Sequence, residues 1–420
     1  MSNNKRSARR RFSFSSPLIW LVLLAGAGGL AFTNGVRLSM GVYLSSLSTS
    51  TRLSIEDISL AFAFAQLCWG LTQPFAGAVA DRIGSGRVIF VAVILVVTGT
   101  ILTPYMTSTS GLIFTMAVLA AGGCGMAGPS VMMASSARLL PASKRGMATG
   151  IVNAGGSTGQ VVMAPLAIWM TAAYGWVTSM QWLGVLVLLA LPAAWILKGN
   201  ARNLTVTMEM DSTRDELTTI QALIMAFKTP SYCLVAAGFM VCGFHVAFLV
   251  THMPGIIAMC GMSSSIGGWS LALIGLFNIV GSLFMGWAVG RWRMKSLLVL
   301  LYSIRGLAVV IFVLSPMTPT VVLIFSAIMG VTFLSTVPPT IGLVAKMFGP
   351  KNLAMLFGVL MMLHQIGGFF GAYMGGRVVQ LTGSYNCMWY LDIALAVAAA
   401  LINLPVHEPR LAPYMKMAGK

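Results

Sequence analysis

Charged side chains are scarce in this sequence, and carboxylates are the scarcest of them. Only 8% of the 420 residues are charged, and only 9 residues are Asp or Glu. Soluble globular chains carry roughly 25% charged residues, so a soluble fold of this composition would leave most of its surface without polar cover. With 57% apolar residues, the chain is instead predicted to be an all-α polytopic membrane protein embedded in a lipid bilayer.

The sequence also lacks the patterns that would indicate an enzyme or a metal centre. It contains no H-E-x-x-H, no G-x-x-x-x-G-K-[ST] and no paired carboxylates. Its six cysteines form no C-x-x-C and mostly fall in apolar segments, so we interpret them as packing residues. We therefore expect no catalytic residues, no metal and no cofactor.

Twelve apolar segments can be distinguished, each near or above the roughly 20 residues needed to cross a bilayer. They predict two bundles of six transmembrane helices joined by a short hydrophilic linker that contains an amphipathic helix from Thr213 to Phe227. The expected parts are a basic tail (1–17), the first bundle (18–197), the linker (198–230), the second bundle (231–405) and a final tail (406–420).

The basic residues are distributed unevenly along the chain. Of the 26 Lys and Arg residues, 22 lie in the two tails and in alternate loops that share one side of the membrane. This is the positive-inside pattern, and it predicts that both termini are cytoplasmic. The net charge of +17 therefore indicates membrane orientation, and we expect no nucleic-acid partner.

The two halves of the chain repeat each other. The loop after the second segment reads G-A-V-A-D-R-I-G-S-G-R from Gly77 to Arg87, and its beginning returns as G-W-A-V-G-R from Gly286 to Arg291. The first copy resembles the signature loop of the major facilitator superfamily, whose residues here are Gly77, Asp81, Arg82, Gly84 and Arg87. The resemblance implies a twelve-helix transporter that works by alternating access, with this loop as a cytoplasmic gate that also includes Gly286 and Arg291.

Within that superfamily the chain is similar to the monocarboxylate porters, including their bacterial oxalate–formate-exchanger-like members. Three stretches carry the similarity: N-G-V-R-L-S-M-G-V-Y from Asn34, T-V-P-P-T from Thr336, and H-Q-I-G-G from His364. The similarity implies a monomeric secondary transporter of small organic anions, which we expect in a bacterial inner membrane. The chain departs from the animal porters at Asn278 and Ser282, where those porters carry an acid and an arginine.

Arg37 is the residue that we expect to bind a substrate carboxylate. A buried arginine costs at least ~2.5–3.5 kcal/mol on membrane-insertion scales, so it is expected to face protein or water, and its planar fork matches a carboxylate. The alternative is a structural bond to helix ends or carbonyls. The predicted substrate site contains Arg37, Asn34, Asn153, His245, His364 and Gln365.

Histidines and one carboxylate are the candidates for proton coupling, because a histidine titrates near neutral pH. When the two halves are aligned, His245 takes the position of Arg37. The coupling candidates are His245, His252, His364 and Asp392. Each histidine could equally be a satisfied core residue. Asp392 is the one carboxylate deep within a segment, and we expect it to form a structural ion pair with Arg305, directly or through water.

We conclude from the sequence that the protein is a transporter of a small, monocarboxylate-like organic anion. Proton symport is the preferred coupling, and exchange against a counter-anion is second. Two further functions stay open: efflux of amphipathic compounds, which 30 methionines would suit, and ligand sensing without transport.

Overall fold

The structure is a computed structural model that describes residues 17–51, 53–138, 145–198, 219–348 and 353–408, and within these ranges every regular element is a helix. The predicted all-α class is confirmed. Ten of the described segments are long and apolar enough to cross a membrane. Two more helices, α3 (Ile55–Ile83) and α8 (Arg145–Tyr174), are equally long but more polar. The number of membrane crossings, twelve, stays a prediction.

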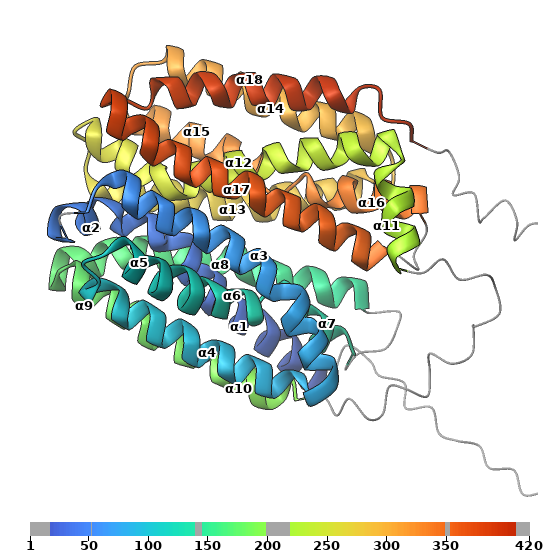
Figure 1. The fold of residues 1–420 in the computed structure, drawn as a ribbon, viewed down its shortest axis with the longest axis horizontal. Coiled ribbons are helices and arrows are strands. Elements are labelled where there is room, and N and C mark those ends of the chain that lie inside the picture. Colours follow the sequence, from blue (N-terminus) through green and yellow to red (C-terminus); the bar gives the residue numbers. More distant parts are fainter. Residues whose placement is uncertain (1–16, 52, 139–144, 199–218, 349–352, 409–420) are drawn as a thin grey trace, which may run out of the picture.

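The first half of the chain forms one group of helices, coloured blue to green in Figure 1. Several are interrupted by short 3-10 or π-helical turns. Besides α3 and α8, its elements are α1 (Pro17–Ser39), η1 (Met40–Tyr43), α2 (Leu44–Thr51), α4 (Ser85–Leu102), η2 (Thr103–Tyr105), α5 (Thr109–Leu112), η3 (Ile113–Ala121), α6 (Gly122–Met126), α7 (Pro129–Arg138), α9 (Trp176–Leu186), η5 (Val187–Ala190) and α10 (Leu191–Ile196).

The second half forms another group, coloured yellow-green to red in Figure 1. Its elements are α12 (Pro230–Met259), α13 (Ser264–Ala288), α14 (Met294–Leu314), α15 (Pro319–Thr332), α16 (Val337–Phe348), α17 (Leu353–Thr382) and α18 (Asn386–Asn403). Before them comes α11 (Thr219–Phe227), which coincides with the end of the predicted linker helix. The predicted start of that helix at Thr213 lies outside the described residues.

Local sequence signals account for several helix ends. The Ser54 hydroxyl accepts the backbone N–H of Asp57 at 3.0 Å and so caps the first turn of α3. Gly84 separates α3 from α4 with a φ of 93°, a conformation that favours glycine, as the motif loop requires. Thr318 caps α15 in the same way as Ser54 caps α3.

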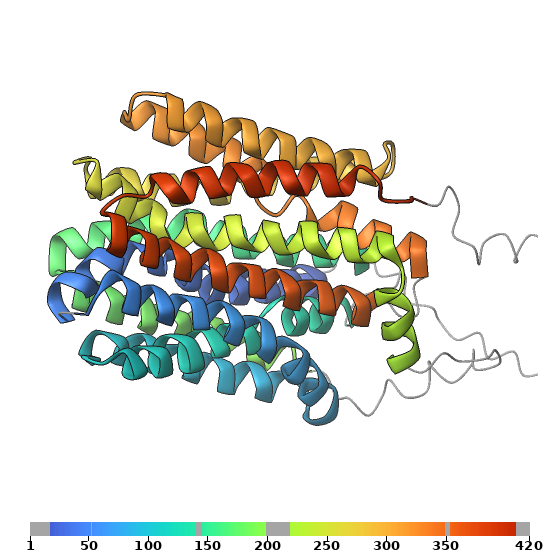
Figure 2. The same ribbon diagram turned by 45° about the horizontal axis from the view of Figure 1, so that its top comes forward.

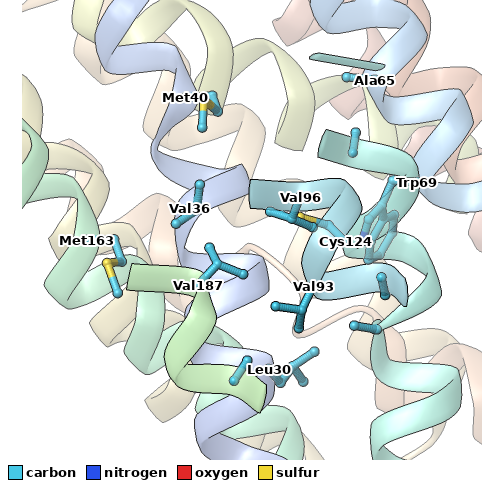
Figure 3. Close-up of a cluster of buried hydrophobic side chains, with 14 of the residues drawn as sticks. Leu30, Val36, Met40, Ala65, Trp69, Val93, Val96, Cys124, Met163 and Val187 are labelled. Atoms are coloured by element: carbon cyan, nitrogen blue, oxygen red, sulfur yellow. The ribbon is translucent and has the colours of Figure 1, made fainter. Parts of the chain in front are cut away.

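The interior of the first half is mainly apolar. Figure 3 shows its centre, where Leu30 and Val36 of α1 meet Val93 and Val96 of α4 and Val187 of η5, all of them buried. Within a bilayer such packing is stabilised by van der Waals contact rather than by exclusion of water. A polar side chain in this setting therefore needs a partner or a function.

The two halves meet mainly along two pairs of helices, and α12 also packs against η1 and α2. α3 lies beside α17, and α8 lies beside α13; the views in Figure 1 and Figure 2 agree on the first pair. We call the end of the molecule that carries the motif loop the basic end, and the other the opposite end. At the opposite end the halves are tightly packed, because a Cβ on Gly376 would collide with Ser59 and one on Gly41 with the carbonyl of Val250.

At the basic end the same helix faces are bare, that is, glycines on them have no neighbouring atoms from the other half within 4 Å of an added Cβ. On α3, Gly70 contacts Gln365 of α17, whereas a Cβ on Gly77, two turns further along the same face, would meet nothing within 4 Å. On α17, Gly358 lies two turns from Gln365 and is equally open. Gly150 of α8 and Gly286 of α13 repeat this arrangement. The halves are therefore closed at the opposite end and parted at the basic end.

Candidate functional site

Arg37 lies half-buried on α1, where its guanidinium contacts three uncharged side chains. Its Nε donates to Oδ1 of Asn34 at 3.3 Å, and its Nη1 donates to Oε1 of Gln66 on α3 at 3.1 Å. The guanidinium also lies over the ring of Trp69, 4.3 Å from the ring centroid. Among the described residues no carboxylate pairs with Arg37, so its charge is available to an anion.

A small cavity adjoins Arg37 inside the first half. Its volume is about 30 Å³, which is room for ordered water and too little for an organic anion. The cavity is mainly apolar and is lined by Val36, Arg37, Met40, Phe62, Ala65, Gln66, Val96, Thr100, Thr103, Met116, Ala120, Ala121 and Cys124. A substrate would therefore reach Arg37 from the space between the halves.

Two of the predicted site residues lie near Arg37 at the interface of the halves. Asn34 contacts Arg37 directly and faces α8, where a Cβ on Gly156 would lie 3.0 Å from its Nδ2. Gln365 projects from α17 against Gly70 of α3. Gln66 lies between Arg37 and α17, because a Cβ on Gly368 would be 3.5 Å from the side chain of Gln66. Four helices, three from the first half and one from the second, thus converge at this level.

Asn153 and His364 lie further from Arg37. Asn153 is exposed on α8, one turn from the contact between Ser157 and the second half, on the part of the helix that leads to the basic end. His364 is buried on α17, with its ring 4.7 Å from that of Phe239 and its Nδ1 3.2 Å from Nε2 of Gln365. His364 is therefore connected to the interface through its neighbour.

His245 lies elsewhere than the repeat predicted, in a buried polar cluster of the second half. Its Nδ1 is 3.3 Å from Nη1 of Arg305 on α14, and its Nε2 is 3.3 Å from Oδ1 of Asp392 on α18. All three side chains are at most 1% exposed. The expected link between Arg305 and Asp392 thus passes through the His245 ring, and the described residues show no direct ion pair between the two.

His252 is also separate from Arg37. Its Nε2 is 2.7 Å from the carbonyl oxygen of Ala372 on α17, and its Nδ1 is 3.1 Å from the hydroxyl of Tyr385 just before α18. The ring fills the space beside Gly375. These contacts hold three segments of the second half together near the opposite end.

Asn278 on α13 joins the halves near the middle of the interface. Its Nδ2 donates to the Ser157 hydroxyl of α8 at 2.9 Å, while its Oδ1 accepts the backbone N–H of Leu334 at 3.0 Å. Leu334 lies in the break between α15 and α16. Ser282 donates to the same Oδ1 at 3.3 Å. The two positions where the animal porters carry charges therefore form a neutral network here.

The predicted gating motif lies at the basic end, on exposed turns. Arg82 and Arg87 are exposed, and Arg291 stacks over the ring of Trp287 at 4.0 Å. The backbone of Asp81 belongs to α3, but its side chain lies outside the part of the chain that is described. The role of this loop as a gate stays a prediction.

One pair at the opposite end was not predicted as functional. Nη1 of Arg377 on α17 lies 2.7 Å from Oε2 and 2.8 Å from Oε1 of Glu56 on α3, and the Tyr373 hydroxyl donates to Oε1 at 3.1 Å. A sequence signal existed, because Arg377 is one of the few basic residues that do not belong to the 22 on the predicted cytoplasmic side. Among the described residues, no group of three or more His, Cys, Asp or Glu side chains could hold a metal ion.

Comparison with known proteins places this geometry in context. The family model described as the Major Facilitator Superfamily matches residues 21–372 and 261–413. Monocarboxylate transporter 13 of Rattus norvegicus is 21% identical over 391 residues, which cover 92% of this chain and 89% of the relative. Monocarboxylate transporter 11 of Mus musculus is 22% identical over 407 residues, which cover 94% of this chain and 88% of the relative.

The fold also matches solved structures. The inward open conformation of the xylose transporter XylE from E. coli superposes with a TM-score of 0.72 at 13% identity, over 96% of this chain and 99% of that chain. At this identity the likeness concerns the fold alone.

Proposed function

Since the chain belongs to the Major Facilitator Superfamily, we propose that it moves a small, monocarboxylate-like organic anion across the membrane by alternating access, coupled to protons. One observation carries the proposal: the guanidinium of Arg37 is half-buried, has no acidic partner among the described residues, and lies at the level where the two halves part. An unpaired cation in a membrane interior favours an anionic ligand. The names of two relatives, both monocarboxylate transporters, support the same substrate class.

The carboxylate would take one edge of the Arg37 fork. Asn34 and Gln66 occupy Nε and Nη1, and Trp69 covers one face of the guanidinium. These contacts orient the group, because a stacked guanidinium keeps its remaining N–H donors in one plane. Asn153, His364 and Gln365 would complete the site as the halves close around the substrate.

The described arrangement corresponds to an inward-facing state. Helix faces that are bare lie at the basic end, and the positive-inside pattern assigns that end to the cytoplasm. If the halves came together at the basic end and separated at the opposite end, Arg37 would become accessible from the other side of the membrane. Such rocking of one bundle against the other moves the access path and leaves the site in place.

The test is uptake of a labelled panel of monocarboxylates into proteoliposomes, with and without an inward proton gradient. Wild-type protein should accumulate at least one member, faster as the external pH falls. Arg37→Ala should abolish uptake, and Arg37→Lys should keep part of it because charge remains without the fork. Lys228→Ala, which removes an exposed cation far from the site, is the matched control. Undiminished uptake by Arg37→Ala would reject the site.

A further inference from the structure

The buried cluster of Arg305, His245 and Asp392 has a defined hydrogen-bond direction. An arginine can only donate, so Nδ1 of His245, 3.3 Å from Nη1 of Arg305, must accept. The ring proton therefore belongs on Nε2, which lies 3.3 Å from Oδ1 of Asp392 and 3.2 Å from the backbone oxygen of the same residue. This assignment makes His245 neutral and leaves Arg305 and Asp392 as the two opposite charges of the cluster.

One further proton has a single suitable place in this cluster. Protonation of His245 at Nδ1 would oppose two donors and break its contact with Arg305. Both carboxylate oxygens of Asp392 lack a hydrogen bond of normal geometry, although the residue is fully buried. Among the described residues, the charged or titratable groups that act on Asp392 are His245 of α12, at 3.3 Å, and Arg305 of α14, on the other side of the His245 ring. Tyr302 of α14 and Cys242 of α12 lie beside Arg305, and His364 of α17 interacts with Cys242.

Arg305 has a second set of partners. Its Nη2 donates to the backbone carbonyls of Thr332 and, at 3.0 Å, Phe333, where α15 ends. The end of a helix carries partial negative charge on its free carbonyls. A proton on Asp392 removes the carboxylate charge, so the guanidinium is then balanced mainly by these carbonyls. The proton state of Asp392 thereby biases how firmly Arg305 holds the break between α15 and α16.

The same break is in contact with the other half of the protein. Asn278 accepts the N–H of Leu334, the residue after Phe333, at 3.0 Å and donates to Ser157 of α8 at 2.9 Å. A series of contacts therefore runs from the Asp392 carboxylate, 3.3 Å from His245, through Arg305 and the backbone of Phe333 and Leu334 to Asn278 and the first half.

We propose that Asp392 is a proton-binding site whose occupancy is transmitted through this series to the interface between the halves. The inference deepens the proposed function, on whose proton coupling it rests. The proton forms an O–H bond on Asp392, taken from water on one side of the membrane and returned to water on the other, with no change of oxidation state. Because the three side chains are at most 1% exposed here, a bound proton stays enclosed until the halves rearrange.

Two measurements on the full chain in lipid, without any substrate, test this inference. Infrared difference spectra between acid and alkaline pH should show a protonated-carboxyl band that is lost in Asp392→Asn. Distances between spin labels at the exposed positions Lys198 and Ser296, at the basic end of each half, should change with pH in the wild type. That change should be lost in Asp392→Asn and in Asn278→Ala, while Asn278→Ala should keep the carboxyl band.

The control is Asp57→Asn, which removes a carboxylate bound to Ser54 and Thr109 at the opposite end and should leave both readouts unchanged. If Asp392→Asn does not fold, His245→Gln serves instead: it should keep the band and lose the distance change. A band that persists in Asp392→Asn, or a distance change that persists in His245→Gln, overturns the inference. Failure of proton-driven uptake with both readouts intact would instead count against the proposed function.

Discussion

Arg377 of α17 binds the carboxylate of Glu56 on α3 through a single nitrogen, Nη1, which lies 2.7 and 2.8 Å from the two carboxylate oxygens. Among the described residues this is the ion pair that joins the two halves. It lies at the end where the halves are packed, and Tyr373 adds a hydrogen bond to the same carboxylate. The pair therefore favours the state in which that end is closed.

Removing the Glu56 charge should open the opposite end more often. In Glu56→Gln, spin labels at the exposed positions Ser110 and Ser264 should show a larger share of long distances than in the wild type, measured with the remaining cysteines replaced. The shift is expected to be modest, because an exposed ion pair is screened by water. The double variant Glu56→Arg with Arg377→Glu should restore the original distribution. Identical distributions in Glu56→Gln and wild type would show that packing alone closes this end.

Trp69 should matter through Arg37. A cation–π contact contributes about 0.5–2 kcal/mol, so Trp69→Leu should weaken binding of a transported carboxylate by roughly 2- to 30-fold. Trp69→Phe keeps an aromatic face and should lose less. Dissociation constants from thermal-shift titrations give the comparison, with the unliganded melting temperature as a check on folding. Equal affinity in wild type and Trp69→Leu would remove Trp69 from the site.

Glycines within the second half should be intolerant of side chains where α12 and α17 touch. A Cβ on Gly371 would collide with the carbonyl of Phe244, and overpacking of this kind typically costs 1–3 kcal/mol. Gly371→Ala should therefore lower the melting temperature in detergent. Gly358→Ala on the same helix has open space around it and should be neutral or slightly stabilising, because alanine favours helix more than glycine does.

Bulk at the bare glycines should instead impair transport. Gly358→Leu, or Gly77→Leu on α3, would obstruct closure of the basic end while leaving the described state unstrained. Uptake should fall although the melting temperature does not, and labels at Lys198 and Ser296 should report a single long distance. Uptake at the wild-type rate in both variants would mean that these faces never meet.

The fold was largely predictable because membrane crossing requires long apolar segments, and these are visible in composition alone. Hydropathy alone is weakest for α3 and α8, which were among the twelve predicted segments but whose glycine and polar residues lower their hydropathy. The position of the two helices accounts for this composition, because both line the interface between the halves, where close packing favours glycine and small polar residues. The sequence predicted these two segments as helices but contains no signal that the least apolar segments lie at the interface between the halves.

The surroundings of Arg37 at the candidate site were predictable in part. Arg37 was identified because a lone charge in an apolar segment is costly, and Asn34 followed from helical spacing. Gln66 and Trp69 come from another helix, and no spacing rule connects them to Arg37. The repeat predicted that His245 lies at the same depth in the membrane as Arg37, but it did not predict which way the His245 side chain points. Because α12 is apolar nearly all round, the sequence contains no signal for which side of this helix faces the interface.

The bare glycine faces have a practical consequence for anyone who purifies this protein. A screen that selects variants for heat resistance in detergent would reward side chains that fill the open space at Gly77, Gly150, Gly286 and Gly358. Those variants would also be trapped in one conformation. Thermostability and turnover should therefore be opposed at these four positions, which makes them a poor choice for improving the transporter and a good one for immobilising it for structure determination.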